Sequence, residues 1–121
     1  MKDFTLHPEA LELKKLGFNE PCFGYFNKSK KLNYDFCGTY PFDNCPVNLR
    51  APTYAQAFRF FREKYGLFVE IKCCNTKIIN GTFEIEISRL NDKMYGHYGY
   101  ETYEEAELEC LKKLIEIVKN K

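Results

Sequence analysis

Two runs of alternating apolar and polar residues dominate the second half of this chain. Residues 83–87 alternate strictly, since Glu84 and Glu86 separate the apolar side chains, and residues 67–73 carry an apolar residue at every second position. Strict alternation predicts strands with one buried face and one face in water. Such strands form antiparallel sheets covered by helices on one side. A third strand is expected over residues 94–100, whose two glycines indicate a bulge or a close backbone approach.

Helix-start signals stand on both sides of these strands. Thr53 precedes Gln56 by three residues, and Thr102 precedes Glu105 by three. In this pattern the hydroxyl accepts from a free N–H of the first turn, and the longer side chain can reach back to the cap. The sequence therefore predicts an α+β fold in the order α-β-β-β-α. Its two helices, residues 53–65 and 103–118, are expected to pack on one face of an antiparallel sheet of about three strands.

The N-terminal part is predicted to add a helix and a β-hairpin. A short amphipathic pattern over residues 8–16 ends at a glycine, and alternating runs at 22–26 and 32–36 flank a polar turn. Residues 38–52 hold three prolines and are expected to form an ordered loop without regular structure. The length fits one domain, residues 1–121, with an extension over 1–50 and a core over 51–121.

Charge and hydropathy restrict the function classes. Eighteen basic and seventeen acidic residues give a formal charge of +1, so no overall field attracts nucleic acid. The N-terminus lacks the apolar run of a signal peptide, and no apolar stretch approaches the ~20 residues of a membrane span. We expect a cytoplasmic protein with reduced cysteines, no membrane partner, and either a protein partner or self-association.

The candidate interaction surface consists of aromatic residues whose burial the sequence leaves open. Phe60 points nearly opposite Phe58 on the predicted helix, so it must contact the N-terminal extension or a partner. Residues 95–100 form the densest aromatic patch, which either binds a partner or planar ligand or covers the edge of the core. Burial of both Phe60 and Tyr98 would remove the main anchors of an interaction surface. The candidate residues are Phe60, Tyr95, His97, Tyr98 and Tyr100.

Catalytic and metal-binding chemistry finds little support in the sequence. Cys22 could act as a nucleophilic thiolate with His7 or His97 as its general base, but no local sequence signature of a cysteine enzyme accompanies these residues. Cys22, Cys37 and Cys45 lie in the loop-rich part without a Cys-x-x-Cys pair, and whether they bind metal is left open. No catalytic residue and no cofactor is predicted. A metal- or cysteine-dependent enzyme stays as an alternative.

In topology, residues 53–118 resemble the double-stranded-RNA-binding domain. Ala106, Cys110 and Leu114 correspond to the positions by which that family's last helix lies on its sheet. Members of that family bind phosphates with lysines at the start of this helix, whereas residues 102–105 here are Thr-Tyr-Glu-Glu. Carboxylates at this place repel a phosphate backbone. Binding of duplex RNA would therefore need another basic surface, formed by Lys28, Lys30, Lys31, Arg59 and Arg62.

The chain also resembles a group of small proteins, with no established activity, from phage and prophage-derived regions of bacterial genomes. The likeness is carried by residues 16–25, 57–65 and 100–107. It implies an accessory role and assigns no site. Together with the surplus of aromatic residues, it leads us to expect a non-enzymatic module that binds another protein or itself. Nucleic-acid binding through a non-standard basic surface is the alternative.

Overall fold

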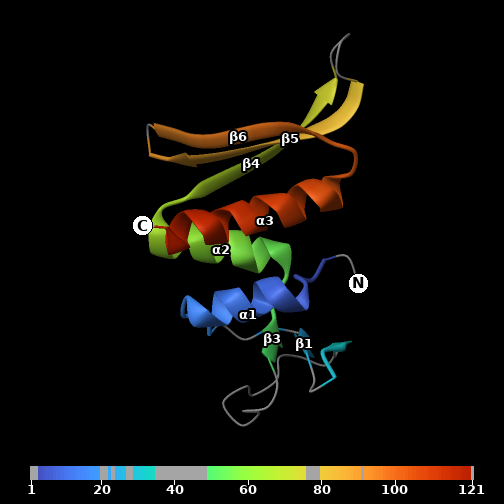
Figure 1. The fold of residues 1–121 in the computed structure, drawn as a ribbon, viewed down its shortest axis with the longest axis vertical. Coiled ribbons are helices and arrows are strands. Elements are labelled where there is room, and N and C mark those ends of the chain that lie inside the picture. Colours follow the sequence, from blue (N-terminus) through green and yellow to red (C-terminus); the bar gives the residue numbers. More distant parts are fainter. Residues whose placement is uncertain are drawn as a thin grey trace. The chain divides into compact units, whose positions relative to one another are not determined.

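The chain contains two compact units, each with its own sheet (Figure 1). The computed structural model describes residues 3–19, 22, 24–26, 29–34, 49–75, 80–90 and 92–120. The first unit spans residues 1–57 and the second residues 58–121, so the boundary falls inside helix α2, Tyr54–Tyr65. None of the helices in the described part is long and apolar enough to cross a membrane.

The first unit contains the predicted helix and hairpin. Helix α1, His7–Lys15, is followed by Gly17, whose φ of 100° suits a residue without a side chain. Strands β1, Gly24–Phe26, and β2, Leu32–Tyr34, pair antiparallel. Both predictions are confirmed.

A third strand in this unit corrects the sequence analysis. Residues 49–51 were expected in an irregular loop, but β3, Leu49–Ala51, pairs antiparallel with β1 on the side away from β2. The three residues of this strand are too short a run to show a period. Its structure depends on a partner more than twenty residues earlier in the chain. Residues 38–48 of the expected loop lie outside the described residues, and Pro52, its last residue, is buried.

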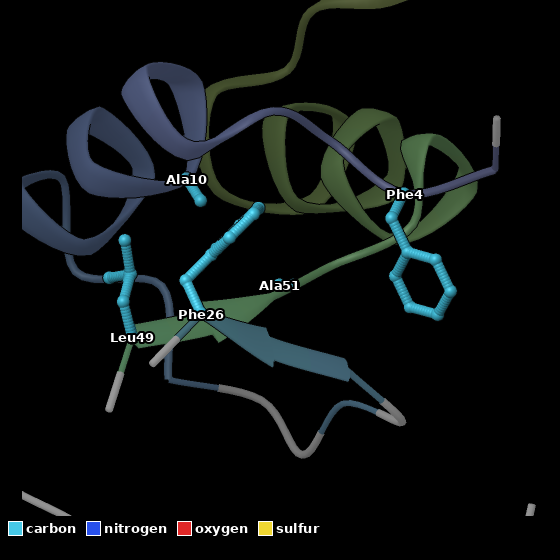
Figure 2. Packing of buried hydrophobic residues seen from close by; sticks show 5 residues of the cluster. All are labelled: Phe4, Ala10, Phe26, Leu49 and Ala51. Atoms are coloured by element: carbon cyan, nitrogen blue, oxygen red, sulfur yellow. The ribbon is translucent and has the colours of Figure 1, made fainter. Parts of the chain in front are cut away.

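The core of the first unit forms where α1 and the N-terminal segment meet this small sheet. Figure 2 shows Phe26 and Leu49 from the sheet with Ala10 from α1, and all three are buried. Phe4 is buried near Gly24, where an added Cβ would lie 2.8 Å from the Phe4 Cε1 atom. The segment is held by the Thr5 N–H, which donates to the Pro52 carbonyl at 2.9 Å.

Helix α2 begins with the predicted capping box. The Gln56 N–H donates to Thr53 Oγ1 at 3.2 Å, and the Thr53 N–H donates to Gln56 Oε1 at 3.0 Å. Both exchanges satisfy backbone or side-chain groups that would otherwise lack a partner at the helix start. Gly66, with a φ of 68°, ends the helix. Residues 58–65 belong to the second unit, where Phe61 is fully buried.

The second unit is built on the predicted antiparallel sheet. Its order is β4-β5-β6, with β4 at Phe68–Asn75, β5 at Asn80–Arg89 and β6 at Asp92–Tyr100. Ile85 and Ile87 of the central strand are 0% exposed, while Glu84 and Glu86 point to the opposite face. The alternation therefore predicted the two faces of this sheet correctly. We call the face that carries Ile85 and Ile87 the inner face and the other the outer face.

Helix α3, Tyr103–Lys119, covers the inner face. It contacts β5 most extensively and also touches β4 and β6 (Figure 1). The helix starts as predicted, because the Glu105 N–H donates to Thr102 Oγ1 at 3.1 Å. Its buried residues follow helical spacing and are Ala106, Cys110, Leu111, Leu114 and Ile115. The α+β class and the helix, strands, helix order are confirmed.

The Thr102 cap is expected to make a measurable contribution to stability. Replacing Thr102 by alanine is expected to lower the free energy of unfolding by about 1 kcal/mol, because one N–H of the first turn loses its acceptor. Thr102→Ser keeps the hydroxyl and should stay within about 0.5 kcal/mol of the parent protein. Urea denaturation measures both. Equal losses for the two variants would show that the cap hydrogen bond does not stabilise α3.

Candidate functional site

Four aromatic residues of β6 form the candidate surface that the sequence predicted for this strand. The register pairs Tyr95 with Ile87, His97 with Ile85 and Tyr100 with Phe83, so these three side chains lie on the inner face. Tyr98 pairs with Glu84 and lies on the outer face. We call Tyr95, His97, Tyr98 and Tyr100 the β6 aromatic cluster. Because β6 is an edge strand, the cluster borders the rim of the sheet.

The inner-face members contact one another and α3. The His97 ring lies 5.4 Å from Tyr100 in a T-shaped arrangement and 6.5 Å from Tyr95. Lys113 of α3 places its Nζ 4.7 Å from the centroid of the Tyr95 ring, an attractive cation–π geometry. Tyr95 and Tyr100 are half-buried, and His97 is exposed. Lys113 of α3 thus contacts the Tyr95 ring, and the imidazole of His97 is left at the surface.

The environment of Tyr100 keeps its hydroxyl protonated. Burial raises the pKa of Tyr100 to about 12, and the neighbouring Tyr95 and the Glu109 carboxylate act in the same direction. Desolvation and nearby negative charge both disfavour a phenolate. Tyr100 therefore remains a neutral hydrogen-bonding group at physiological pH and does not serve as a base.

Tyr98 is the most exposed aromatic residue of the cluster. Its side chain is 58% exposed on the outer face, and its ring centroid lies 6.3 Å from that of His97. The outer face around it carries three carboxylates, Glu70, Glu84 and Glu86. Lys72 lies among them, with its Nζ 3.7 Å from Glu70 Oε1 and 3.6 Å from Glu86 Oε2.

Electrostatics confirm the acidic character of this face. The Glu70 and Glu86 carboxylates, with Glu84, raise the pKa of Lys72 above its usual value. A nearby negative charge favours the ammonium form. The carboxylates of the outer face thus stabilise the positive charge of Lys72.

Phe60 does not join this surface. It is only 8% exposed, and its ring packs edge-on against Phe61 at 5.4 Å and Tyr65 at 5.9 Å. The Lys64 ammonium lies 5.4 Å from the centroid of the Phe60 ring. Of the two alternatives for this residue, burial within the chain applies. The candidate surface is therefore restricted to β6.

The cysteines and histidines lie in varied surroundings. Cys110 is a buried residue of α3, and burial together with Glu107 raises the pKa of its thiol to about 12. His7 packs edge-on against Phe26 at 5.3 Å. Cys37 and Cys45 lie outside the described residues. Within the part that is described, no group of three histidine, cysteine or acidic residues is placed to hold a metal ion.

The residues weighed for RNA binding are divided between the two units. Glu104 and Glu105 are exposed in the first turn of α3, where a double-stranded-RNA-binding domain carries lysines. Arg59 Nε lies 2.9 Å from Glu63 Oε1, so a carboxylate accompanies this cation. Lys30 and Lys31 are exposed in the first unit, and Lys28 lies outside the described residues.

Comparisons with known proteins leave the site to be interpreted from its own chemistry. No protein-family model, curated protein or solved structure was found to match this chain. Sequence analysis missed one member of the surroundings of the site, Lys113. No local signal marks this residue, because its contact with Tyr95 depends on how α3 crosses the sheet.

Proposed function

We propose that this chain is a non-enzymatic interaction module that binds a protein partner through the β6 aromatic cluster. The single observation that carries the proposal is the exposure of Tyr98, which is 58% accessible on an edge strand. Tyrosine is enriched among the residues that dominate binding energies, because it offers a large rigid surface with a polar end. His97 adds a second exposed ring beside it.

Side chains, and not backbone pairing, are expected to make the contacts at β6. The strand has register shifts on both sides of its central part, at Met94 and at Gly99. Bulges of this kind interrupt the regular row of N–H and C=O groups that an added strand needs. The partner is therefore expected to lie over the Tyr98 ring on the outer face.

The charge of the outer face favours a cationic group on the partner. Tyr98 lies directly opposite Glu84, and Glu86 follows on the same face of β5. An arginine can stack on a tyrosine ring and pair with a carboxylate at the same time. The proposed partner is thus a protein that presents an arginine or lysine at Tyr98. The accessory role in a phage or prophage, implied by the resemblance, is part of the same proposal.

Site-specific photocrosslinking tests this surface. A photoreactive phenylalanine analogue in place of Tyr98 is expected to capture a defined protein in cells of the native host. The same analogue at Leu90, which is 79% exposed at the β5–β6 turn, serves as the control and should not capture it. Equal capture at both positions, or none at Tyr98, would contradict the proposal.

A binding assay with the purified chain distinguishes the nucleic-acid alternative from the proposed protein partner. Duplex RNA is expected to show no binding at low salt, where phosphate contacts are strongest. Salt-dependent binding that is lost on replacing Lys30, Lys31, Arg59 and Arg62 would favour the RNA-binding alternative over the protein partner.

A further inference from the structure

The two edges of the second sheet differ in how they are protected. Edge strand β6 carries shifts at Met94 and Gly99, which hinder pairing with another chain. Edge strand β4 has no such register shift over most of its length. Phe68 through Cys74 pair with β5 without a shift, and this segment contains no glycine or proline. The edge of β4 that points away from β5 therefore offers a regular row of N–H and C=O groups to an incoming strand.

The side chains of β4 on the inner face are also incompletely covered. Ile85 and Ile87 of β5 are 0% exposed, whereas their neighbours Ile71 and Val69 are only half-buried, and Cys73 is exposed. Helix α3 lies mainly over β5 and contacts β4 less. A strand added beside β4 would remove more of this apolar row from water, which favours association.

The outer row of β4 has a self-complementary charge pattern. Glu70 and Lys72 stand on either side of Ile71 and point to the same face. If two copies of β4 pair antiparallel about Ile71, Glu70 of each copy lies opposite Lys72 of the other. Opposite charges in directly facing positions stabilise a pair of strands, and like charges destabilise it.

We propose that β4 pairs antiparallel with β4 of a second copy of this chain, with Ile71 on the two-fold axis. The pairing joins the β4-β5-β6 sheet of one copy to the same sheet of the second copy, so that the two form one continuous sheet. It places Val69 of one copy opposite Cys73 of the other on the inner face. An isologous contact of this kind is the commonest way in which soluble proteins form dimers.

The charges within one copy support this register. Glu70 lies directly opposite Glu86 on β5, and Lys72 is near both of these carboxylates. In the dimer, Lys72 of the second copy supplies a further cation next to Glu70. The inference is independent of the proposed function, because β4 and β6 are opposite edges of the sheet.

Disulfide crosslinking tests the register. Cys73 and Cys74 are first replaced by serine, and one cysteine is then added to the four that remain by Ile71→Cys or, as the matched control with the same background, Val69→Cys. In the proposed register two copies of residue 71 face each other at the ~4.5–5.5 Å Cα spacing of paired strands. Two copies of residue 69 are separated by about 13 Å along the strands. Mild oxidation should therefore give covalent dimers with Ile71→Cys and far fewer with Val69→Cys.

A charge exchange provides a second test that needs no cysteine. Glu70→Lys or Lys72→Glu alone places like charges opposite each other across the axis and should weaken the dimer at least about tenfold. The double variant Glu70→Lys with Lys72→Glu restores opposite pairs and should recover dimer formation. Light scattering measures the dissociation constant of each, and circular dichroism verifies that each variant is folded.

The outcomes separate the proposal from its alternatives. A parent protein that remains monomeric up to about 1 mM, the range of weak complexes, would overturn it. Equal crosslinking at positions 69 and 71 would overturn the register, and so would a double variant that dimerises no better than the single ones. Failure of the Tyr98 experiment leaves these readouts unchanged, since they concern β4 alone.

Discussion

Replacing Phe61 by alanine is expected to lower the free energy of unfolding by about 3–5 kcal/mol, the usual loss for a buried phenylalanine. Phe61 is fully buried, and its ring contacts those of Phe60 and Tyr65 at 5.4 and 5.9 Å. The substitution removes the apolar contacts and leaves a cavity that the neighbouring rings fill only in part. Urea denaturation followed by circular dichroism measures the loss.

Phe68 gives a matched control for this substitution. It is also a phenylalanine of the second unit, but it is 43% exposed at the start of β4. Phe68→Ala is expected to cost no more than about 1 kcal/mol, since less apolar surface returns to water. A loss at Phe61 as small as the loss at Phe68 would contradict the burial of the Phe61 side chain.

The second large effect is a loss of stability at alkaline pH. Burial raises the pKa of Cys110 from 9.0 to about 12. Between these values the unfolded chain releases the thiol proton and the folded chain keeps it, so unfolding becomes more favourable as the pH rises. This contribution to stability is complete below pH 9 and is lost by about pH 12. At about 1.4 kcal/mol per pKa unit, the three units correspond to about 4 kcal/mol as an upper bound.

The Cys110→Ala variant isolates this effect. It is expected to be less stable than the parent at pH 7, but its free energy of unfolding should fall less steeply between pH 9 and pH 12. Part of the slope above pH 10 should persist, because Tyr100 has its pKa raised from 10.0 to about 12. Denaturation in the presence of a reductant gives both profiles. Parallel profiles would show that Cys110 does not contribute.

Local signals predicted the starts of α2 and α3 and the sheet of the second unit. The caps at Thr53 and Thr102 form hydrogen bonds with residues three positions later, so a short window of sequence contains all the partners. The alternation around Ile85 likewise predicted which side chains are buried. Strand β3 was not predicted, because it is stabilised by pairing with β1, which lies far away in the sequence.

The candidate surface shows where periodicity fails. Tyr98 and Tyr100 are two residues apart, and regular alternation would place both on one face. The shift at Gly99, whose φ is 103°, puts Tyr98 opposite Glu84 and Tyr100 opposite Phe83 instead. The glycine indicated a bulge, but its effect on the side-chain faces depends on the register with β5. The exposure of Tyr98 was therefore not predictable from the sequence.

The binding affinity of the Tyr98→Ala variant tests the central claim most directly. With the protein captured at Tyr98, isothermal titration calorimetry should show binding at least about tenfold weaker than that of the parent chain, as expected for an aromatic residue at the centre of an interface. Leu90→Ala, at an exposed position away from the cluster, should bind within about twofold of the parent. Equal affinities of the parent and Tyr98→Ala would contradict the proposed interaction surface.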